Sequence, residues 1–346
     1  MNPRSAWLAK TVATIALAYN MNAAAAAQGR TDVVTLGNGD RITGEIVHLE
    51  RGRLEFKTDD IGTLYFEWDN LVSLVTTRLV EVTTTDGIVF LGTLGQATDG
   101  SIAVVSTDAT AQLLMADVTE ITTIGRSFWR KLDGSFDIGF NYTRSSGVAQ
   151  LNVNTDTVYR RPKSQTRLSV SFTQTEQSDE GGDDRGAIDL SYRRYPWPRW
   201  FIAGVARVET NESLGVEIRS QLGSAIGPRL VNSNRAQLTI GAGVAVNDER
   251  GVDVEPVQTL EGLLLFEASY YTYDRPRTNI DVTAQYYPSL TDPGRQRLQL
   301  DAAVRREFFK DLFVSLSVFY TLDTRPPNPD ADTYDVGVLW SIGWTF

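Results

Sequence analysis

The chain of 346 residues is long enough for one large or two modest domains, and it is acidic, with 33 Lys and Arg against 43 Asp and Glu. Because phosphate binding needs clustered basic charge, this balance argues against nucleic acid as a partner. The chain has no cysteine, which excludes disulfides, thiolate chemistry and a lipid anchor on an N-terminal cysteine.

Residues 1–27 have the pattern of a secretory signal peptide. Arg4 and Lys10 are basic, Thr11 to Tyr19 is a short apolar stretch, and small residues with Ala-x-Ala sites lead up to Ala27. We therefore expect cleavage near Ala27; an uncleaved anchor helix is the alternative, which the short apolar stretch disfavours. No later run of 18 apolar residues occurs, so no transmembrane helix is expected.

Residues 28–125 are predicted to form a periplasmic tandem β-repeat domain. The repeat is carried by positions 48 residues apart, namely Gly39 and Gly87, Gly44 and Gly92, Gly52 and Gly100, and Asp69 and Asp117. Each unit has the pattern of about five short bent strands, which predicts two small Sm-like or SH3-like barrels. Such folds bind peptides, other proteins or RNA, and the acidic charge disfavours RNA. The alternative is that the repeats only pack on each other and on the rest of the chain.

Residues 126–133 are predicted to be a linker at a membrane boundary, where basic and aromatic residues such as Arg126, Trp129 and Lys131 gather. From residue 134 to 346, side chains alternate between apolar and polar, as in half-buried strands. This alternation predicts twelve strands, an even number that suits a bacterial β-barrel. They are 134–143, 149–159, 164–176, 185–195, 199–208, 215–227, 234–247, 257–272, 278–288, 295–306, 311–321 and 334–346.

The predicted connections alternate in length, as expected when both ends of a barrel chain are periplasmic. Even-numbered connections are short and rich in proline, aromatic and basic residues, as at Arg161-Pro162-Lys163. Odd-numbered ones, such as Gln177 to Asp184 and Asp323 to Thr333, are longer and acidic, although the first odd connection is short. The sequence thus predicts an all-β chain with a transmembrane antiparallel barrel of about 12 strands at residues 134–346.

One face of each predicted strand carries the charges. An Arg or Lys on the lipid face at mid-bilayer costs roughly 2–4 kcal/mol, so these charges are expected to point into the lumen. The lumen-facing candidates are Asp137, Arg167, Asp189, Arg193, Arg207, Glu217, Arg219, Glu261, Asp281, Arg297, Asp301 and Arg305. Two interpretations remain open: an interior filled by ion pairs with no pore, and a narrow aqueous channel.

The last predicted strand ends on Phe346. Aromatic and β-branched residues fill every second position back to Tyr334, as in the closing strand of an outer-membrane barrel. Trp344 and Phe346 are therefore predicted to be an assembly signal, read by a barrel assembly machinery.

The repeat region followed by twelve strands, the opening stretch Phe136 to Asn141 and the closing Trp344-Thr345-Phe346 together resemble a known family. Residues 130–346 are similar to the salt-induced outer-membrane protein family, whose function is unknown. The resemblance implies an outer-membrane location and supplies no catalytic residues.

The chain offers little for catalysis. Its one histidine, His48, falls on the polar side of a predicted strand in the first repeat, where we expect it to be solvated. Activation of a serine near neutral pH relies on histidine, and the barrel region has none. The acidic stretches 179–184 and 330–332 have oxygen ligands for Ca²⁺ or Mg²⁺ but match no EF-hand loop, so we expect solvated loops without metal or cofactor.

Three functional hypotheses follow. The first is a non-enzymatic, porin-like outer-membrane barrel of a Gram-negative cell, acting as a narrow channel or in envelope maintenance. The second is a barrel that anchors a periplasmic binding module, whose partner is a periplasmic protein or the cell wall. The third, an outer-membrane hydrolase, is opposed by the lack of a barrel histidine. All three place the protein against outer-membrane lipid and lipopolysaccharide.

Overall fold

The computed structural model describes residues 31–96, 100–107, 109–124, 132–143, 148–161, 163–177, 183–211, 216–251, 255–273, 276–309, 312–327 and 332–344. Thr31–Phe346 form one compact unit. The chain is almost entirely β-strand, arranged in two antiparallel sheets. The predicted signal peptide, most of the linker and Phe346 lie outside the described residues.

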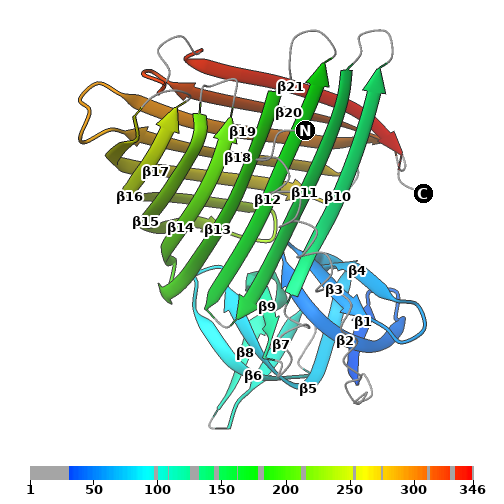
Figure 1. Cartoon of the computed structure of the whole chain (residues 1–346). Coiled ribbons are helices and arrows are strands. Elements are labelled where there is room, and N and C mark those ends of the chain that lie inside the picture. Colours follow the sequence, from blue (N-terminus) through cyan, green and yellow to red (C-terminus); the bar gives the residue numbers. More distant parts are fainter. Residues whose placement is uncertain are drawn as a thin grey trace, which may run out of the picture. The chain divides into compact units, whose positions relative to one another are not determined.

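The first sheet, blue to cyan in Figure 1, has nine strands in the order β4-β3-β2-β1-β5-β6-β7-β8, and β9 pairs with β2 and β5. Its elements are β1 (Asp32–Leu36), β2 (Arg41–Glu50), β3 (Arg53–Lys57), β4 (Thr63–Glu67), η2 (Trp68–Asn70), β5 (Leu71–Thr84), β6 (Val89–Gly95), β7 (Ser101–Val105), β8 (Thr110–Leu114), η3 (Met115–Asp117) and β9 (Val118–Thr123).

The order of elements in this sheet repeats. β1 to β4, η2 and the first part of β5 are followed by the second part of β5, β6 to β8, η3 and β9. β1 pairs with the start of β5 in the first half, and the end of β5 pairs with β9 in the second. The predicted alignment of Asp69 with Asp117 is off by one residue, because the turn 58–62 of the first half is one residue longer than the turn 106–109 of the second. Whether each half is an Sm-like or SH3-like barrel stays a prediction.

The two halves share one core. Buried side chains from both halves, including Val34, Leu54, Ile102 and Ile121, form a single cluster. The indole Nε1 of Trp68 donates a hydrogen bond of 2.6 Å to the carbonyl of Met115, 47 residues later. A buried indole N–H needs such a partner, so this bond fixes the two halves against each other.

The second sheet has twelve strands that pair strictly in chain order from β10 to β21. They are β10 (Leu132–Thr143), β11 (Val148–Arg161), β12 (Ser164–Gln177), β13 (Asp183–Trp197), β14 (Trp200–Asn211), β15 (Val216–Asn232), β16 (Ala236–Gly251), β17 (Val257–Thr272), β18 (Thr278–Pro288), β19 (Gln296–Phe309), β20 (Leu312–Asp323) and β21 (Tyr334–Trp344). The number and order of the predicted strands are confirmed.

Several of these strands are longer than predicted. β13 and β15 continue through Pro196 and Pro228, where the prediction placed turns. Proline cannot donate a ladder hydrogen bond, so it is tolerated in strands at irregularities. The register shifts next to both prolines, between Arg194 and Trp197 and between Arg229 and Val231.

The twelve-stranded sheet curls back on itself. Arg185 of β13 pairs with Asp335 of β21 at 3.3 Å, and Arg193 of β13 pairs with Glu267 of β17 at 2.8 Å. Neighbouring strands are about 4.8 Å apart, so eight spacings in a flat sheet would separate β13 and β21 by roughly 38 Å. The side chains meet because β18–β21 lie behind the first strands of the sheet, as Figure 1 shows. We call the face with these ion pairs the inner face.

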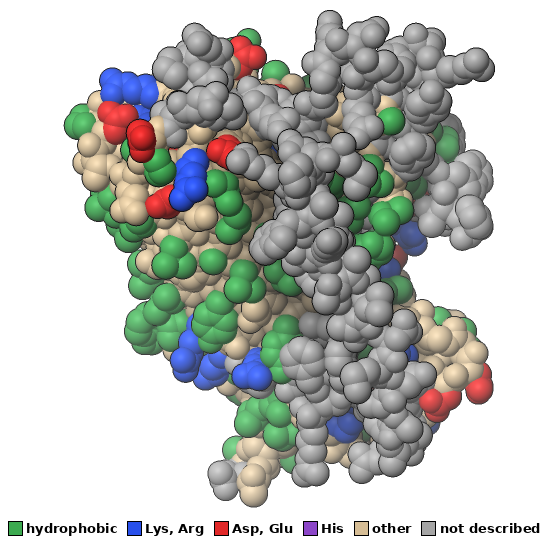
Figure 2. Space-filling view, in the orientation of Figure 1, with side chains coloured by type: hydrophobic (Ala, Val, Ile, Leu, Met, Phe, Trp, Pro, Cys, Tyr) green, Lys and Arg blue, Asp and Glu red, His purple; other side chains and the backbone are tan. Residues whose placement is uncertain are grey.

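The outer face carries large apolar side chains. Tyr334, Val336, Val338, Trp340 and Ile342 of β21 are each more than half exposed. On β17, Leu264 is 52% exposed whereas Leu263, on the inner face, is 6% exposed. On the side seen in Figure 2, hydrophobic side chains are spread over the middle of the sheet and charged ones gather toward its two ends. Among the helices in the described part of the chain, none is long and apolar enough to cross a membrane.

The first sheet contacts the end of the second sheet where the even-numbered connections lie. The N–H of Lys163 donates to Glu81 at 2.9 Å, and the side-chain amide of Asn234 donates to the carbonyl of Val118 at 2.9 Å. Arg277 lies 3.6 Å from Glu67. The longer, odd-numbered connections lie at the opposite end of the strands.

Candidate functional site

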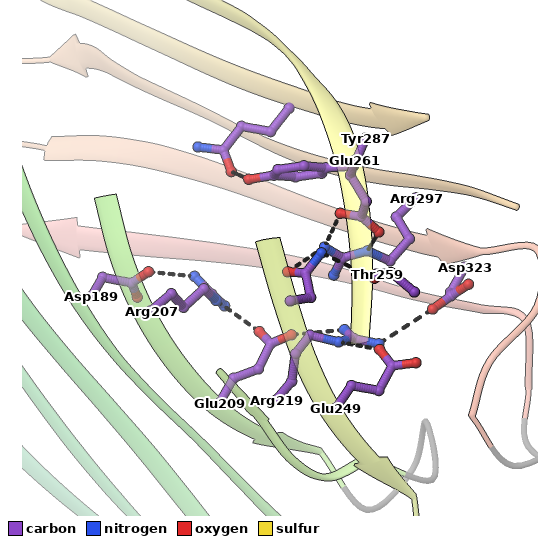
Figure 3. Close-up of polar contacts among 12 residues, drawn as sticks. Asp189, Arg207, Glu209, Arg219, Glu249, Thr259, Glu261, Tyr287, Arg297 and Asp323 are labelled. Carbon is purple, nitrogen blue, oxygen red and sulfur yellow. Dashed lines mark hydrogen bonds and ion pairs between the residues drawn. The ribbon is translucent and has the colours of Figure 1, made fainter. Parts of the chain in front are cut away.

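A cluster of buried charges crosses the inner face close to the odd-numbered connections (Figure 3). Arg219 of β15 donates to Glu209 and Glu249 at 2.8 Å each and to Asp323 at 3.3 Å. Arg295 donates to Asp323 at 2.7 Å and lies 2.8 Å from Glu249. These five residues are called the Arg219 cluster, and they tie β14, β15, β16 and β20 to the segment before β19.

The cluster is almost fully removed from solvent. The side chains of Arg219, Glu249, Arg295 and Asp323 are at most 5% exposed. A buried ion pair carries a desolvation penalty that only good geometry and additional hydrogen bonds offset. Here each guanidinium contacts at least two carboxylates, so the charges are compensated by one another rather than by water.

A second buried pair lies next to the cluster. Arg297 of β19 donates two hydrogen bonds, of 2.6 and 2.9 Å, to Glu261 of β17, and a third to Asn247 of β16. The guanidinium lies 4.9 Å from the ring centre of Tyr287. Two parallel N–H donors on one carboxylate fix its orientation, which makes this pair rigid as well as buried.

Two further arginines continue the network toward the other end of the strands. Arg207 bridges Asp189 at 2.8 Å and Glu209 at 2.7 Å. Arg193 holds Glu267 through two hydrogen bonds of 2.8 and 2.9 Å. The network as a whole cross-links β13 to β17, β19 and β20 across the inner face.

The other predicted lumen-facing residues are less tightly held. Asp281 accepts hydrogen bonds from Ser269 and from Arg51 of the first sheet. Arg167 lies 3.9 Å from Asp156, and the guanidinium of Arg305 lies 3.6 Å from the ring centre of Phe313. Asp301 is an exposed residue of β19.

Three of the predicted positions need comment. Glu217 is exposed and lies at a shift in register between Val216 and Ile218, so alternation alone does not fix the face of its side chain, and its lumen-facing position stays a prediction. The side chain of Asp137 lies outside the described residues, as does that of Trp344, whose backbone ends β21 beside Leu312. The assembly signal therefore stays a prediction.

Sequence reasoning missed several members of the network. Glu209, Glu249 and Asp323 were placed outside the predicted strands, yet β14, β16 and β20 continue to include them. Acidic residues near a strand end look like loop residues when alternation is the only guide. The signal that would have found them is continued alternation, as in Arg207-Val208-Glu209.

A cavity of about 540 Å³ lies at the opposite end of the inner face, between the two sheets. Four ion pairs line it: Glu50 with Arg160 at 2.7 Å, Glu120 with Arg229 at 2.6 Å, Asp281 with Arg51 at 3.1 Å, and Glu267 with Arg193 at 2.8 Å. The first three of these pairs join residues of the first sheet to residues of the second.

Two carboxyls of the first sheet have shifted pKa values in this cavity. Burial raises the pKa of Glu81, and this effect prevails over the N–H of Lys163, which lowers it. Burial also acts to raise the pKa of Glu50, but the nearby Arg160, His48 and Arg51 side chains outweigh it, so that pKa is lowered. Glu81 is therefore more easily protonated than an ordinary glutamate, and Glu50 less easily.

His48 lines the same cavity, with Nδ1 3.6 Å from Glu55, and its side chain is only 16% exposed. His48 is thus a partly buried strand residue at the cavity wall, less exposed than the expected solvated position. Among the described residues, no group of three or more His, Cys, Asp and Glu is arranged to hold a metal ion. The acidic stretches 179–184 and 330–332 fall largely outside that part of the chain.

Comparison with known proteins identifies one family. A family model described as "Protein of unknown function, DUF481" matches residues 135–346. No curated protein matches the chain. A solved structure described as "Bacterial polysaccharide outer membrane secretin" is similar with a TM-score of 0.35 and 11% identity, covering 78% of this chain and 97% of that one. At this level the similarity assigns no function.

Proposed function

We propose that this chain, which belongs to the family described as "Protein of unknown function, DUF481", is a non-enzymatic outer-membrane β-barrel with a closed interior. In this proposal β10–β21 span the membrane and the first sheet lies on the periplasmic side. The barrel then serves envelope maintenance by holding the first sheet at the membrane, rather than by conducting solutes.

The observation that carries the proposal is the reversed distribution of side chains in the twelve-stranded sheet. Large apolar residues occupy the exposed outer face, and ion-paired residues such as Arg219 and Glu261 are buried on the inner face. A water-soluble sheet places charges outside and apolar residues inside. The reversed order suits lipid on the outer face, as in outer-membrane barrels.

The closed interior is supported by the Arg219 cluster and the Arg297–Glu261 pair. Six side chains that are at most 5% exposed leave no water around them, and an aqueous pore requires hydrated walls. Of the two interpretations left open by the sequence, these contacts favour the filled interior over the narrow channel.

The anchoring role is supported by the polar contacts between the sheets. Arg229–Glu120, Arg160–Glu50 and Arg51–Asp281 link residues of the first sheet to three different strands of the second. Three ion pairs of this kind hold the first sheet in a fixed position relative to the barrel, as an anchoring role requires. A periplasmic protein or the cell wall is then the partner class expected for the surface of the first sheet that faces away from the second sheet.

The absence of enzymatic activity is part of the proposal. General-base activation of a serine relies on histidine, and the one histidine of the sequence, His48, lies beside Glu55 in the first sheet and not in the twelve-stranded sheet. Lipid and lipopolysaccharide are then structural surroundings of the barrel and not substrates. Detectable hydrolysis of phospholipid or peptide by the purified protein would contradict this part.

The closed interior is tested by planar-bilayer recording with the purified full-length protein. We expect no stepwise current from the wild type. An Arg219→Ser, Arg297→Ser variant is expected to conduct, because it removes the two arginines at the centre of the buried network. The control is Arg325→Ser, whose exposed ion pair with Asp292 lies in a connection. Steady conductance by the wild type would contradict the closed interior and favour the narrow aqueous channel.

A further inference from the structure

We propose that the cavity between the two sheets binds a small multivalent oxyanion, that is, a solute bearing several phosphate or carboxylate groups. This site is distinct from the Arg219 cluster at the other end of the strands. It depends on contacts between the sheets and not on membrane insertion, so it stands or falls separately from the proposed function.

The cavity has the size and the lining of a ligand site. Its volume of about 540 Å³ lies within the roughly 300–1,000 Å³ that small-molecule sites occupy. Its walls are formed by side chains from both sheets, and hydroxyl and amide groups such as those of Ser191, Gln237 and Thr239 lie between the charges. Groups of this kind donate hydrogen bonds to an oxyanion without adding negative charge.

The charge of the lining favours an anion. Seven Arg and Lys line the cavity against five Asp and Glu, a surplus of two positive charges. Four of the carboxylates are used in the ion pairs described above, and Glu81 accepts the backbone N–H of Lys163.

The surplus positive charge is concentrated on one hairpin. Arg161, Lys163 and Arg167 lie at the end of β11 and the start of β12, and all three are exposed. Arg161 donates to the hydroxyl of Tyr159 and lies over its ring. Arg167 has only the 3.9 Å contact with Asp156, which is also about half exposed. Solvent therefore reaches these cations, and so can a dissolved ligand.

A buried donor in the cavity wall also lacks a partner. Arg229 is 8% exposed, its Nη1 donates to Glu120 and its guanidinium lies 4.8 Å from the ring centre of Tyr195, but its Nε has no hydrogen-bond partner among the described residues. A buried donor without an acceptor costs about 1–3 kcal/mol in general, and native proteins rarely retain one without a purpose. Because Arg229 lines the cavity, a bound oxyanion is the acceptor that this proposal assigns to it.

The test is isothermal titration of the full-length protein, in detergent, with pyrophosphate, citrate and spermidine. We expect one molecule of pyrophosphate or citrate to bind per chain, and no binding of the cation spermidine. The preferred anion tells whether the natural solute carries phosphate or carboxylate groups. Because each charge-assisted contact contributes strongly, Arg161→Gln, Arg167→Gln should weaken binding about tenfold or more.

The matched control is Arg194→Gln. Arg194 is an exposed neighbour of Arg193 on β13 but does not line the cavity, so its variant should bind both anions like the wild type. Unchanged affinity in the double variant, equal loss in the control, or no binding of either anion by the wild type at millimolar concentration would each overturn the proposal. Far-UV circular dichroism of the exposed-residue variants checks that all are folded.

Discussion

Arg219 is the residue on which the buried cluster depends most. It contacts three carboxylates from three other strands, so its loss leaves Glu209 with Arg207 alone and Glu249 and Asp323 with Arg295 alone. We expect Arg219→Met to lower the free energy of unfolding by about 3–5 kcal/mol, as when one partner of a buried pair is removed. The measurement is urea unfolding in lipid vesicles, followed by tryptophan fluorescence.

The control for this prediction is Arg325→Met. Arg325 pairs with Asp292 at 2.6 Å, but its side chain is 56% exposed. Exposed pairs contribute about 0–1 kcal/mol. Equal changes in the two variants would mean that the Arg219 cluster is not buried from water as described.

Gly92 lies where β6 and β7 approach so closely that a side chain does not fit. A Cβ at this position would lie 2.4 Å from the carbonyl oxygen of Val105, whereas a Cβ at Gly95 on the same strand would lie at an ordinary 3.6 Å from Val105. We expect Gly92→Ala to lower the thermal midpoint, with a loss of about 1–3 kcal/mol typical of overpacking, and Gly95→Ala to change it little. Calorimetry of both variants measures the two thermal midpoints, and equal midpoints would contradict the close approach of β6 and β7 at Gly92.

Glu50 and Glu81 are predicted to give opposite pH dependence. The raised pKa of Glu81 means that the folded state binds its proton more readily, so stability falls as pH rises from 4.5 through that higher pKa. The lowered pKa of Glu50 means that its stabilisation is present above 4.5 and is lost as pH falls through the lower pKa.

The corresponding variants separate the two effects. Glu81→Gln keeps the acceptor for the N–H of Lys163, so it should be more stable than the wild type at neutral pH and should lose this advantage below pH 4.5. Glu50→Gln should be less stable at neutral pH, with a difference that shrinks in acid. Unfolding midpoints measured across this pH range check both, and parallel curves for the variants and the wild type would refute the assignments.

Among the elements, β21 presents its apolar face most openly. Val338 lies in the middle of this strand and is 62% exposed. If this face meets lipid, Val338→Arg should cost about 2–4 kcal/mol and reduce the fraction that folds into vesicles, measured by heat-dependent mobility on gels. The matched variant Thr333→Arg, at an exposed residue just before the strand, should fold like the wild type. Equal folding of the two would argue that water covers the face.

The strands could be predicted closely because alternation is a local property. Leu168, Val170 and Phe172 alternate with polar residues, and β12 runs from Ser164 to Gln177 as that pattern requires. Strand ends were harder, since Glu249 and Asp323 lie where charge density resembles a loop. Their carboxylates are buried in strands because they form ion pairs with Arg219 and Arg295, which lie on other parts of the chain. A local sequence pattern contains no information about such partners.

The same limit applies to the candidate sites. Alternation assigned Arg193, Arg207, Arg219 and Arg297 to one face, and the structure brings all four into ion pairs on that face. It could not tell that Arg193 meets Glu267, because that contact depends on how tightly the sheet curls. Nor could it show the cavity, which exists only where the first sheet meets the second.

At the scale of the whole molecule, the two ends of the curled sheet differ. The buried Arg219 cluster lies near the odd-numbered connections, and the polar cavity lies next to the first sheet. Both features depend on charges that face inward, and that arrangement is favourable only if the outer face is covered by something apolar. Lipid on the outer face is therefore the central claim of the proposed function.

The most direct test of this claim uses the natural absence of cysteine, because a single introduced cysteine can be spin-labelled without removing others. Leu264→Cys and Leu263→Cys place the label on the outer and inner faces of β17, at positions 52% and 6% exposed. In vesicles, the label at 264 should collide often with oxygen and rarely with a water-soluble nickel complex, and the label at 263 rarely with either. Frequent nickel collisions at 264 would contradict the account.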